Sequence, residues 1–194
     1  MAFNDDAVIK ISTAYFYTAR VGTAAPTNPV NPGKEWENVG HTPLEDILQM
    51  TSEGGEKTTL GSLQNRNLKN SYSAKQTTFN FAIHQFDTPG LKLYLGSNAV
   101  EKGGRIGPHD TPQPTSAAWL VVIIDGDQYF DFYVPKADIL GADDIALADT
   151  ESLSSLPLSV TPLRMQSEDA AWFTSGVKEV PEGSTVPDPV GEGT

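Results

Sequence analysis

The fold is decided by residues 119–134, whose sequence is WLVVIIDGDQYFDFYV. Its first six residues form a continuous apolar run, which suits a strand buried on both faces. The next three residues, Asp125-Gly126-Asp127, predict a tight hairpin turn because glycine adopts a positive φ at little steric cost. We therefore expect residues 128–134 to return as an antiparallel strand, so that this hairpin forms the centre of the core.

The predicted return strand has two different faces, because successive side chains of a strand point to opposite sides. Phe130, Phe132 and Val134 share one face, which we expect to pack inward. The opposite face holds Tyr129, Asp131 and Tyr133, which we expect to face away from the core.

The same alternation occurs in two other segments, and it predicts a β-rich fold. Phe79, Phe81 and Ile83 share one face of a predicted strand, and together with Trp119, Phe130 and Phe132 they are the candidate core residues. Residues 8–17 alternate as well, with Ile9, Ile11, Thr13, Tyr15 and Tyr17 on one face. Weaker strand candidates are 37–41, 47–51, 57–63, 139–147 and 157–163. The predicted fold is mainly β, a barrel or a sandwich, with one short flanking helix and extended loops.

Helix signals are scarce. Residues 87–96 have a capping residue at Asp87 or Thr88, Pro89 in the first turn and Gly96 at the end, which predicts a short helix. A second short helix is expected to start at Ser167 and to include Ala171 and Trp172. Long loops are expected over 24–34 and 103–115, which are rich in proline and glycine.

We expect one domain over residues 1–180, with an N-terminal arm at about 1–7. Residues 181–194 combine proline, glycine and acidic residues with little apolar surface to bury, so we expect a disordered tail. The longest apolar run is much too short to cross a bilayer, and no contact with a membrane is expected.

The charge is unevenly distributed along the chain. The net charge is −12, which argues against a protein that grips nucleic-acid phosphates. Residues 57–75 nevertheless contain no acidic residue and four basic ones, namely Lys57, Arg66, Lys69 and Lys75. Such an arrangement is compatible with ordinary solvated surface. It also fits a contact in which the basic segment of one copy meets the acidic surface of another.

No pattern predicts catalysis or a cofactor. The chain has no cysteine, and His41, His84 and His109 are too widely spaced for a metal-binding motif. The aspartates around the 125–127 turn do not follow a calcium-loop pattern, and aspartate forms turns through its own local hydrogen bonds. Trp36, Trp119 and Trp172 could form a sugar-binding platform, but burial in the core or an interface is the simpler interpretation. We expect a structural protein, with neither an enzymatic site nor a bound metal.

Several segments, in their order along the chain, carry a resemblance to a known family. They are 21–26 (VGTAAP), 36–42 (WENVGHT), 51–62 (TSEGGEKTTLGS), 79–96, and 133–138 (YVPKAD) leading to 156–158. Together they resemble the major tail, or tail tube, proteins of long flexible-tailed bacteriophages, particularly those of actinobacterial hosts. The likeness covers roughly residues 7–175.

The resemblance implies a virion protein that forms hexameric rings, which stack into a tail tube through which DNA is ejected. It implies that a long loop, here about 50–72, and the N-terminal arm make contacts between rings. On that basis Lys57, Arg66, Lys69 and Lys75 would make contacts between subunits or rings, and Tyr129, Asp131 and Tyr133 would face the lumen or a neighbouring subunit.

The implied partners are further copies of the chain and the tape measure, tail tip and tail terminator proteins. DNA would pass without specific binding, and assembly would take place in the host cytoplasm. Two alternatives stay open at this point. One is another virion part, such as a head–tail completion or capsid decoration protein, and the other is a β-sandwich carbohydrate-binding module.

Overall fold

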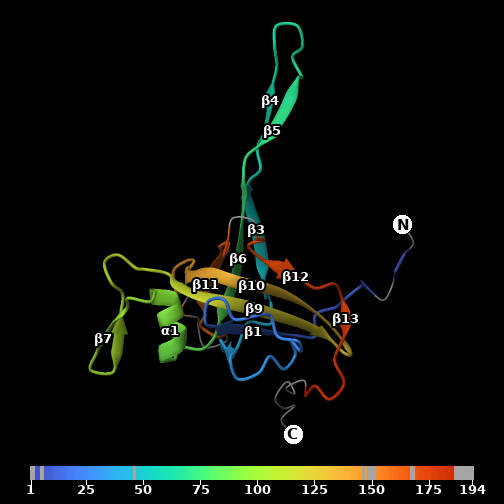
Figure 1. Cartoon of the computed structure of the whole chain (residues 1–194). Helices are drawn as coiled ribbons and strands as arrows, with labels where there is room; N and C mark the ends of the chain where they lie inside the picture. The colour runs from blue at the N-terminus through green and yellow to red at the C-terminus, as the bar shows by residue number, and fades with distance from the viewer. Residues whose placement is uncertain are drawn as a thin grey trace.

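The computed structural model describes residues 3–4, 7–45, 47–145, 147, 152–166 and 169–185. The described chain is mostly β, with one short helix at the side of the sheet (Figure 1). The predicted mainly β fold is therefore confirmed.

The central hairpin forms as predicted. β9 (Thr115–Asp125) pairs antiparallel with β10 (Gln128–Gly141), and Gly126, at a φ of 56°, lies in the turn between them. β10 is longer than predicted, because it continues past Val134 and includes Ile139. The separate strand expected over 139–147 is therefore wrong.

Both faces of β9 are buried, and they belong to two different core clusters. Trp119, Val121 and Ile123 belong to the first core cluster, which also contains Phe16, Phe79, Phe81 and Ile83. Leu120, Val122 and Ile124 belong to the second core cluster, with Tyr17, Val30, Trp36 and Tyr129. The continuous apolar run is thus explained by burial on both sides of the sheet.

A β-bulge in β10 keeps its apolar side chains on one face. Val134 pairs with Trp119 and Ala137 with Ala117, so that Pro135 and Lys136 lie opposite a single residue of β9. The extra residue shifts the alternation by one, and Val134 and Ala137 therefore both reach the first core cluster. Proline has no N–H to donate to a ladder, and a bulge is one of the few places in a sheet that tolerate it.

The main sheet has the strand order β2-β1-β9-β10-β11-β6-β3. Its other strands are β1 (Thr13–Ala19), β2 (Glu37–Asn38), β11 (Leu156–Pro162), β6 (Lys75–Ile83) and β3 (Gln49–Gly54). β12 (Phe173–Thr174) and β13 (Lys178–Glu179) pair with the first half of β10. The sheet does not close, so of the two predicted architectures the structure agrees with the sandwich and not with the barrel.

The sheet folds over so that distant strands face each other. β9, β10 and β11 separate β1 from β6 in the sheet, yet Phe16 of β1 stacks on Phe81 of β6 with ring centroids 4.6 Å apart. Trp119 contacts both rings, at centroid distances of 6.2 and 5.8 Å. These aromatic contacts hold the two ends of the sheet together.

The first strand starts later than predicted. The alternation suggested a strand from residue 8, but β1 begins at Thr13, and Val8 and Ile11 are exposed. β9 ends at Asp125, so the chain before β1 has no further residue of β9 to pair with. Instead the Asp125 carboxylate accepts hydrogen bonds from the Lys10 backbone N–H, at 2.7 Å, and from the Ser12 hydroxyl, at 3.1 Å.

The predicted helix is confirmed as α1 (Thr88–Leu95). The Asp87 carboxylate caps it by accepting a hydrogen bond from the Gly90 N–H at 2.8 Å, and Pro89 lies in its first turn. Gly96 ends the helix at a φ of 98°, and a side chain there would collide with the Gln113 carbonyl oxygen.

Two other local expectations are corrected. Part of the loop predicted over 103–115 is a small hairpin, β7 (Val100–Lys102) and β8 (Arg105–Gly107), turning at Gly103-Gly104. Ser167 lies outside the described residues, but Ala171 and Trp172 are not helical. Instead Trp172 packs edge-on against Phe79, with centroids 5.7 Å apart, just before β12.

The weaker strand candidates correspond to real but mostly shifted or shorter strands, β2, β3, β4 (Lys57–Leu60) and β11. In the predicted tail, Ser184 and Thr185 are hydrogen-bonded to Asn28 and Asn31 of the 24–34 loop. Residues 186–194 lie outside the described residues, so the tail and the single-domain boundary stay predictions.

Replacing Phe16 with alanine tests the aromatic contact between the ends of the sheet. We expect Phe16→Ala to lower the free energy of unfolding by about 3–5 kcal/mol, because a buried ring is replaced by a cavity. Urea denaturation measures the change. Phe3→Ala is the matched control, because the Phe3 side chain is fully exposed, and it should change stability by less than about 0.5 kcal/mol. Equal losses in the two variants would contradict the packing argument.

Candidate assembly surface

A long β-hairpin projects from the edge of the main sheet (Figure 1). β3 and β6 continue into β4 and β5 (Lys69–Tyr72) without a shift in register, since Gly54 pairs with Lys75 and Lys57 with Tyr72. At about 3.4 Å per residue, the paired stretch 49–60 is about 40 Å long. We call residues 49–76 the hairpin arm. The long loop expected over 50–72 is thus a two-stranded arm.

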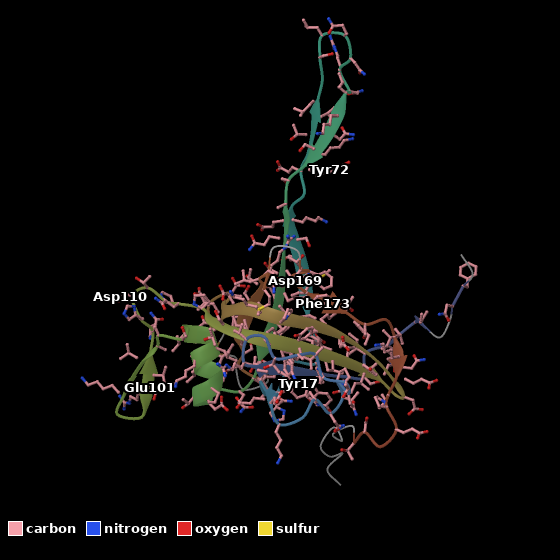
Figure 2. All side chains as sticks on the ribbon, viewed as in Figure 1. Tyr17, Tyr72, Glu101, Asp110, Asp169 and Phe173 are labelled. Atoms are coloured by element: carbon pink, nitrogen blue, oxygen red, sulfur yellow. The ribbon has the colours of Figure 1, made fainter. Side chains whose placement is uncertain are left out.

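Polar cross-strand contacts support the arm. The Thr59 hydroxyl donates to the Asn70 side-chain oxygen at 2.9 Å, and the Ser52 and Thr77 hydroxyls lie 3.4 Å apart. Figure 2 shows Tyr72 part-way along the arm, with side chains pointing to solvent on both sides. Apart from Gly55, every residue of the arm is exposed. The arm therefore owes its shape to backbone pairing and not to a hydrophobic core.

The four basic residues predicted to make contacts all lie on the arm. Lys57 and Lys69 lie in its distal strands, Arg66 lies in the loop at its tip, and Lys75 lies opposite Gly54 near its middle. The structure brings them together on one projecting element. Their contacts with another subunit stay a prediction.

The arm also exposes large apolar side chains that were not predicted from the sequence to make contacts. Leu63 is fully exposed, and Leu60, Leu68 and Tyr72 are more than half exposed. Burying apolar surface is worth about 25 cal/mol per Å², and contiguous exposed apolar residues typically mark an interaction site. The signal in the sequence was the recurrence of leucine at 60, 63 and 68 among polar residues.

Two glycines interrupt the ladder near the middle of the arm. Gly54 and Gly55 have φ values of 82° and 71°, a region that side-chain-bearing residues rarely adopt. A Cβ at Gly54 would collide with the Ala74 carbonyl oxygen of the facing strand. The pair separates the base of the arm from its distal part, residues 57–72, and we call it the glycine joint.

The face of β10 predicted to point away from the core is largely covered within the subunit. Tyr129 is 4% and Asp131 9% exposed, while Tyr133 is half-buried and donates its hydroxyl to the Thr23 carbonyl at 2.7 Å. Residues 25–29 and 173–178 cover this face and line a 430 Å³ cavity with it. The expectation that Tyr129 and Asp131 face outward is corrected, and a contact with a lumen or neighbour stays a prediction.

Asp131 connects the segment that contains β12 and β13 to β10 through hydrogen bonds. Its backbone N–H donates to the Ser175 hydroxyl at 3.1 Å, and its carboxylate accepts from the Ser175 N–H at 3.3 Å. Burial raises the pKa of Asp131 above its ordinary value, with the hydrogen bonds from Ser175 and the charge of Lys178 opposing the shift. The group is structural, because its polar atoms are engaged within the subunit.

The other expected core residues differ in how deeply they are buried. Phe79, Phe81, Ile83 and Trp119 are at most 5% exposed. Phe130 and Phe132 are only partly buried and pack at the rim of the first core cluster, because the other neighbours of this part of β10, β12 and β13, are only two residues long.

The described residues show neither a cluster of metal ligands nor an exposed platform of tryptophans for a sugar. They contain no group of three or more metal-ligating side chains. Trp36 and Trp119 are buried, so the three tryptophans do not form an exposed platform. His84 lies 2.9 Å from the Ser154 carbonyl oxygen, and His109 accepts the Thr111 N–H at 3.1 Å. No helix in the described chain is long and apolar enough to cross a membrane.

Comparison with known proteins identifies the family. Residues 1–183 match the family described as phage tail tube protein. The chain belongs to this family. It is 35% identical to the major tail protein Gp23 of Mycobacterium phage L5, over 94% of this chain and all of the relative. It is 34% identical to the major tail protein Gp23 of Mycobacterium phage D29, over 87% of this chain and 90% of that protein.

Family membership confirms the resemblance noted in the sequence. The tail tube protein is a structural component of the virion tail and not an enzyme. The carbohydrate-binding alternative is therefore wrong.

Neutralising Asp131 tests the consequence of its burial. A raised carboxyl pKa means that the folded state holds its proton to higher pH than the unfolded chain. The contribution of Asp131 to the free energy of unfolding is therefore most favourable below its ordinary pKa of 3.8. That contribution is lost as the pH rises through the raised pKa of the folded state. We expect Asp131→Asn to be more stable than wild type at pH 7, with the difference shrinking toward pH 4.

Urea denaturation at the two pH values measures this difference. Asp127→Asn, at an exposed residue of the β9–β10 turn, is the control and should show no such trend. A difference that is independent of pH would show that Asp131 acts through its hydrogen bonds alone.

A substitution at the glycine joint tests whether the distal part of the arm depends on it. We expect Gly54→Ala to abolish the hydrogen-exchange protection of amides in 57–72, because of both the backbone strain and the contact with Ala74. Amides of β9 and β10 should stay protected. Gly33→Ala is the control, since Gly33 has a φ of 90° but a Cβ added there would have no atom within 4 Å. Unchanged protection of the distal arm in Gly54→Ala would refute the prediction.

Proposed function

We propose that the chain assembles into rings that stack as the phage tail tube, with the hairpin arm making contacts between rings. The observation that supports this proposal is the arm itself. It extends about 40 Å, it buries almost nothing against its own subunit, and it carries exposed leucines together with basic residues. Such an element costs backbone entropy to order, and contacts with another copy would offset that cost.

Charge supports the same assignment. The net charge of the whole chain is −12, and residues 57–75 contribute +4, so the remainder carries −16. The arm projects away from the body of its own subunit (Figure 1), so its basic residues can meet the acidic body of another copy, and unlike charges would then face each other across the interface. Contacts of this head-to-tail kind generate rings or filaments when repeated.

The proposal extends to the role of the tube. Six copies per ring and passage of DNA into the host follow from the family resemblance. An acidic excess suits a conduit, since a lining that repels phosphates lets DNA slide. This repulsion acts over about 8 Å at physiological salt. The tape measure, tail tip and tail terminator proteins are the proposed partners besides further copies of the chain.

Reversing two charges at the distal end of the arm tests its role in assembly. We expect Arg66→Glu combined with Lys69→Glu to raise the protein concentration at which tubes form by about tenfold or more, because opposed charges become like charges. Negative-stain microscopy and sedimentation velocity measure assembly, and circular dichroism checks that the monomer folds.

The matched control is Lys102→Glu combined with Arg105→Glu. It makes the same charge change on the β7–β8 hairpin and should leave assembly close to wild type. If the arm variant forms tubes at the wild-type concentration, the charge contact through the arm is excluded. If the wild-type chain never forms rings or tubes at high concentration, self-assembly itself is excluded.

A further inference from the structure

A groove between β2 and helix α1 is the feature that remains unexplained within one subunit. It consists of two adjoining hollows of 320 and 340 Å³, which share Thr18, Glu37, Leu93 and Thr115 in their walls. We call this the β2–α1 groove. In the strand order of the main sheet, β2 is at the opposite end from β3, the strand that continues into the arm.

Acidic side chains are in excess around this groove. Glu35 and Glu37 flank Trp36, and because that ring is buried at 6% exposure, both carboxylates remain at the surface. Asp87 also lines the groove but caps α1. The basic residues are Arg20 and Lys92, and Lys92 forms an ion pair with Glu101 at 2.5 Å. The groove therefore presents a net negative charge to an incoming partner.

The groove also has apolar and incompletely satisfied polar surface. Leu93 of α1 is partly buried, and Ala117 of β9 is buried beside it. Thr115 Oγ1 is buried and has no hydrogen-bond partner among the described residues. A hydroxyl in this position could accept or donate a hydrogen bond to a partner seated in the groove.

Two other large hollows in the described surface fit a basic partner less well. The cavity beside Tyr129 is lined by one acid and one base, Asp131 and Lys178. The hollow at the base of the arm has Lys75 and Arg164 as its only charged lining residues, and both are basic. Charge thus distinguishes the β2–α1 groove from both.

We propose that the β2–α1 groove receives the distal part of the hairpin arm of another copy. In β4 and β5, Leu60 pairs directly with Lys69, so an apolar and a basic side chain lie together on one face of the arm. In this arrangement the leucine would contact the apolar residues of the groove, and the lysine would face its acidic residues. The arm extends away from α1 in Figure 1, so another copy must supply it. This inference rests on the proposed function and names the surface that receives the arm.

Site-directed cross-linking tests the placement directly. The chain has no cysteine, so introduced thiols are the only ones present. Copies carrying Lys69→Cys are mixed with copies carrying Glu37→Cys, assembled, and treated with a short bismaleimide. We expect a covalent dimer on a denaturing gel from the mixture and none from either variant alone. Lys102→Cys mixed with Glu37→Cys is the matched control and should give no dimer.

Reciprocal charge reversal tests the energetics. Glu35→Lys combined with Glu37→Lys should raise the concentration needed for tubes by about tenfold, as the arm double variant does. Joining all four substitutions in one chain should restore assembly to near the wild-type concentration. Glu179→Lys with Glu182→Lys makes the same charge change at exposed positions elsewhere and should have little effect.

The outcomes separate this inference from the proposed function. If the arm variant fails to assemble while the groove variant assembles normally and no cross-link forms, the arm acts at another surface and the groove inference is overturned. Failure of the fourfold variant to recover, together with no cross-link, also overturns it. If wild-type chains make no rings or tubes at all, the proposed function is overturned.

Discussion

The structure depends on the burial of β9 from both sides. A strand whose six central residues are all apolar cannot leave either face in water, so material must cover each face. On one side the sheet itself folds over, and Phe81 of the far strand β6 reaches Phe16 and Trp119. On the other side the 24–36 segment, with Val30 and Trp36, covers Leu120 and Val122. The remaining strands and loops are arranged around this requirement.

Parts of the fold with strong local causes could be predicted from the sequence. The hairpin turn at Gly126 and the helix between Asp87 and Gly96 each depend on backbone geometry that a few residues determine. The bulge at Pro135 and Lys136 could not be predicted, because it is recognised only when β9 is placed opposite. The late start of β1 likewise depends on the capture of Lys10 and Ser12 by Asp125, a contact that spans more than a hundred residues.

The candidate assembly surface was predictable in composition but not in shape. The basic residues of 57–75 were visible in the sequence, and so was their isolation from acidic residues. Neither face of the arm is buried, so the segment has no alternating apolar pattern. Its sequence therefore predicted a loop. Only the pairing of Thr59 with Asn70 and of Leu60 with Lys69 shows that it is a ribbon. The acidic groove beside α1 is assembled from four separate segments, which no local pattern links.

The unbroken register of the hairpin arm has a consequence for how such a protein can change over generations. Adding the same number of residues to both strands keeps every existing cross-strand pair, and each added pair lengthens the arm by about 3.4 Å. Because the arm contributes almost nothing to either core cluster, such an insertion does not disturb the packing of the body. Arm length and arm chemistry can therefore diverge between lineages while the body is held nearly constant, and an arm can be exchanged between relatives as a unit.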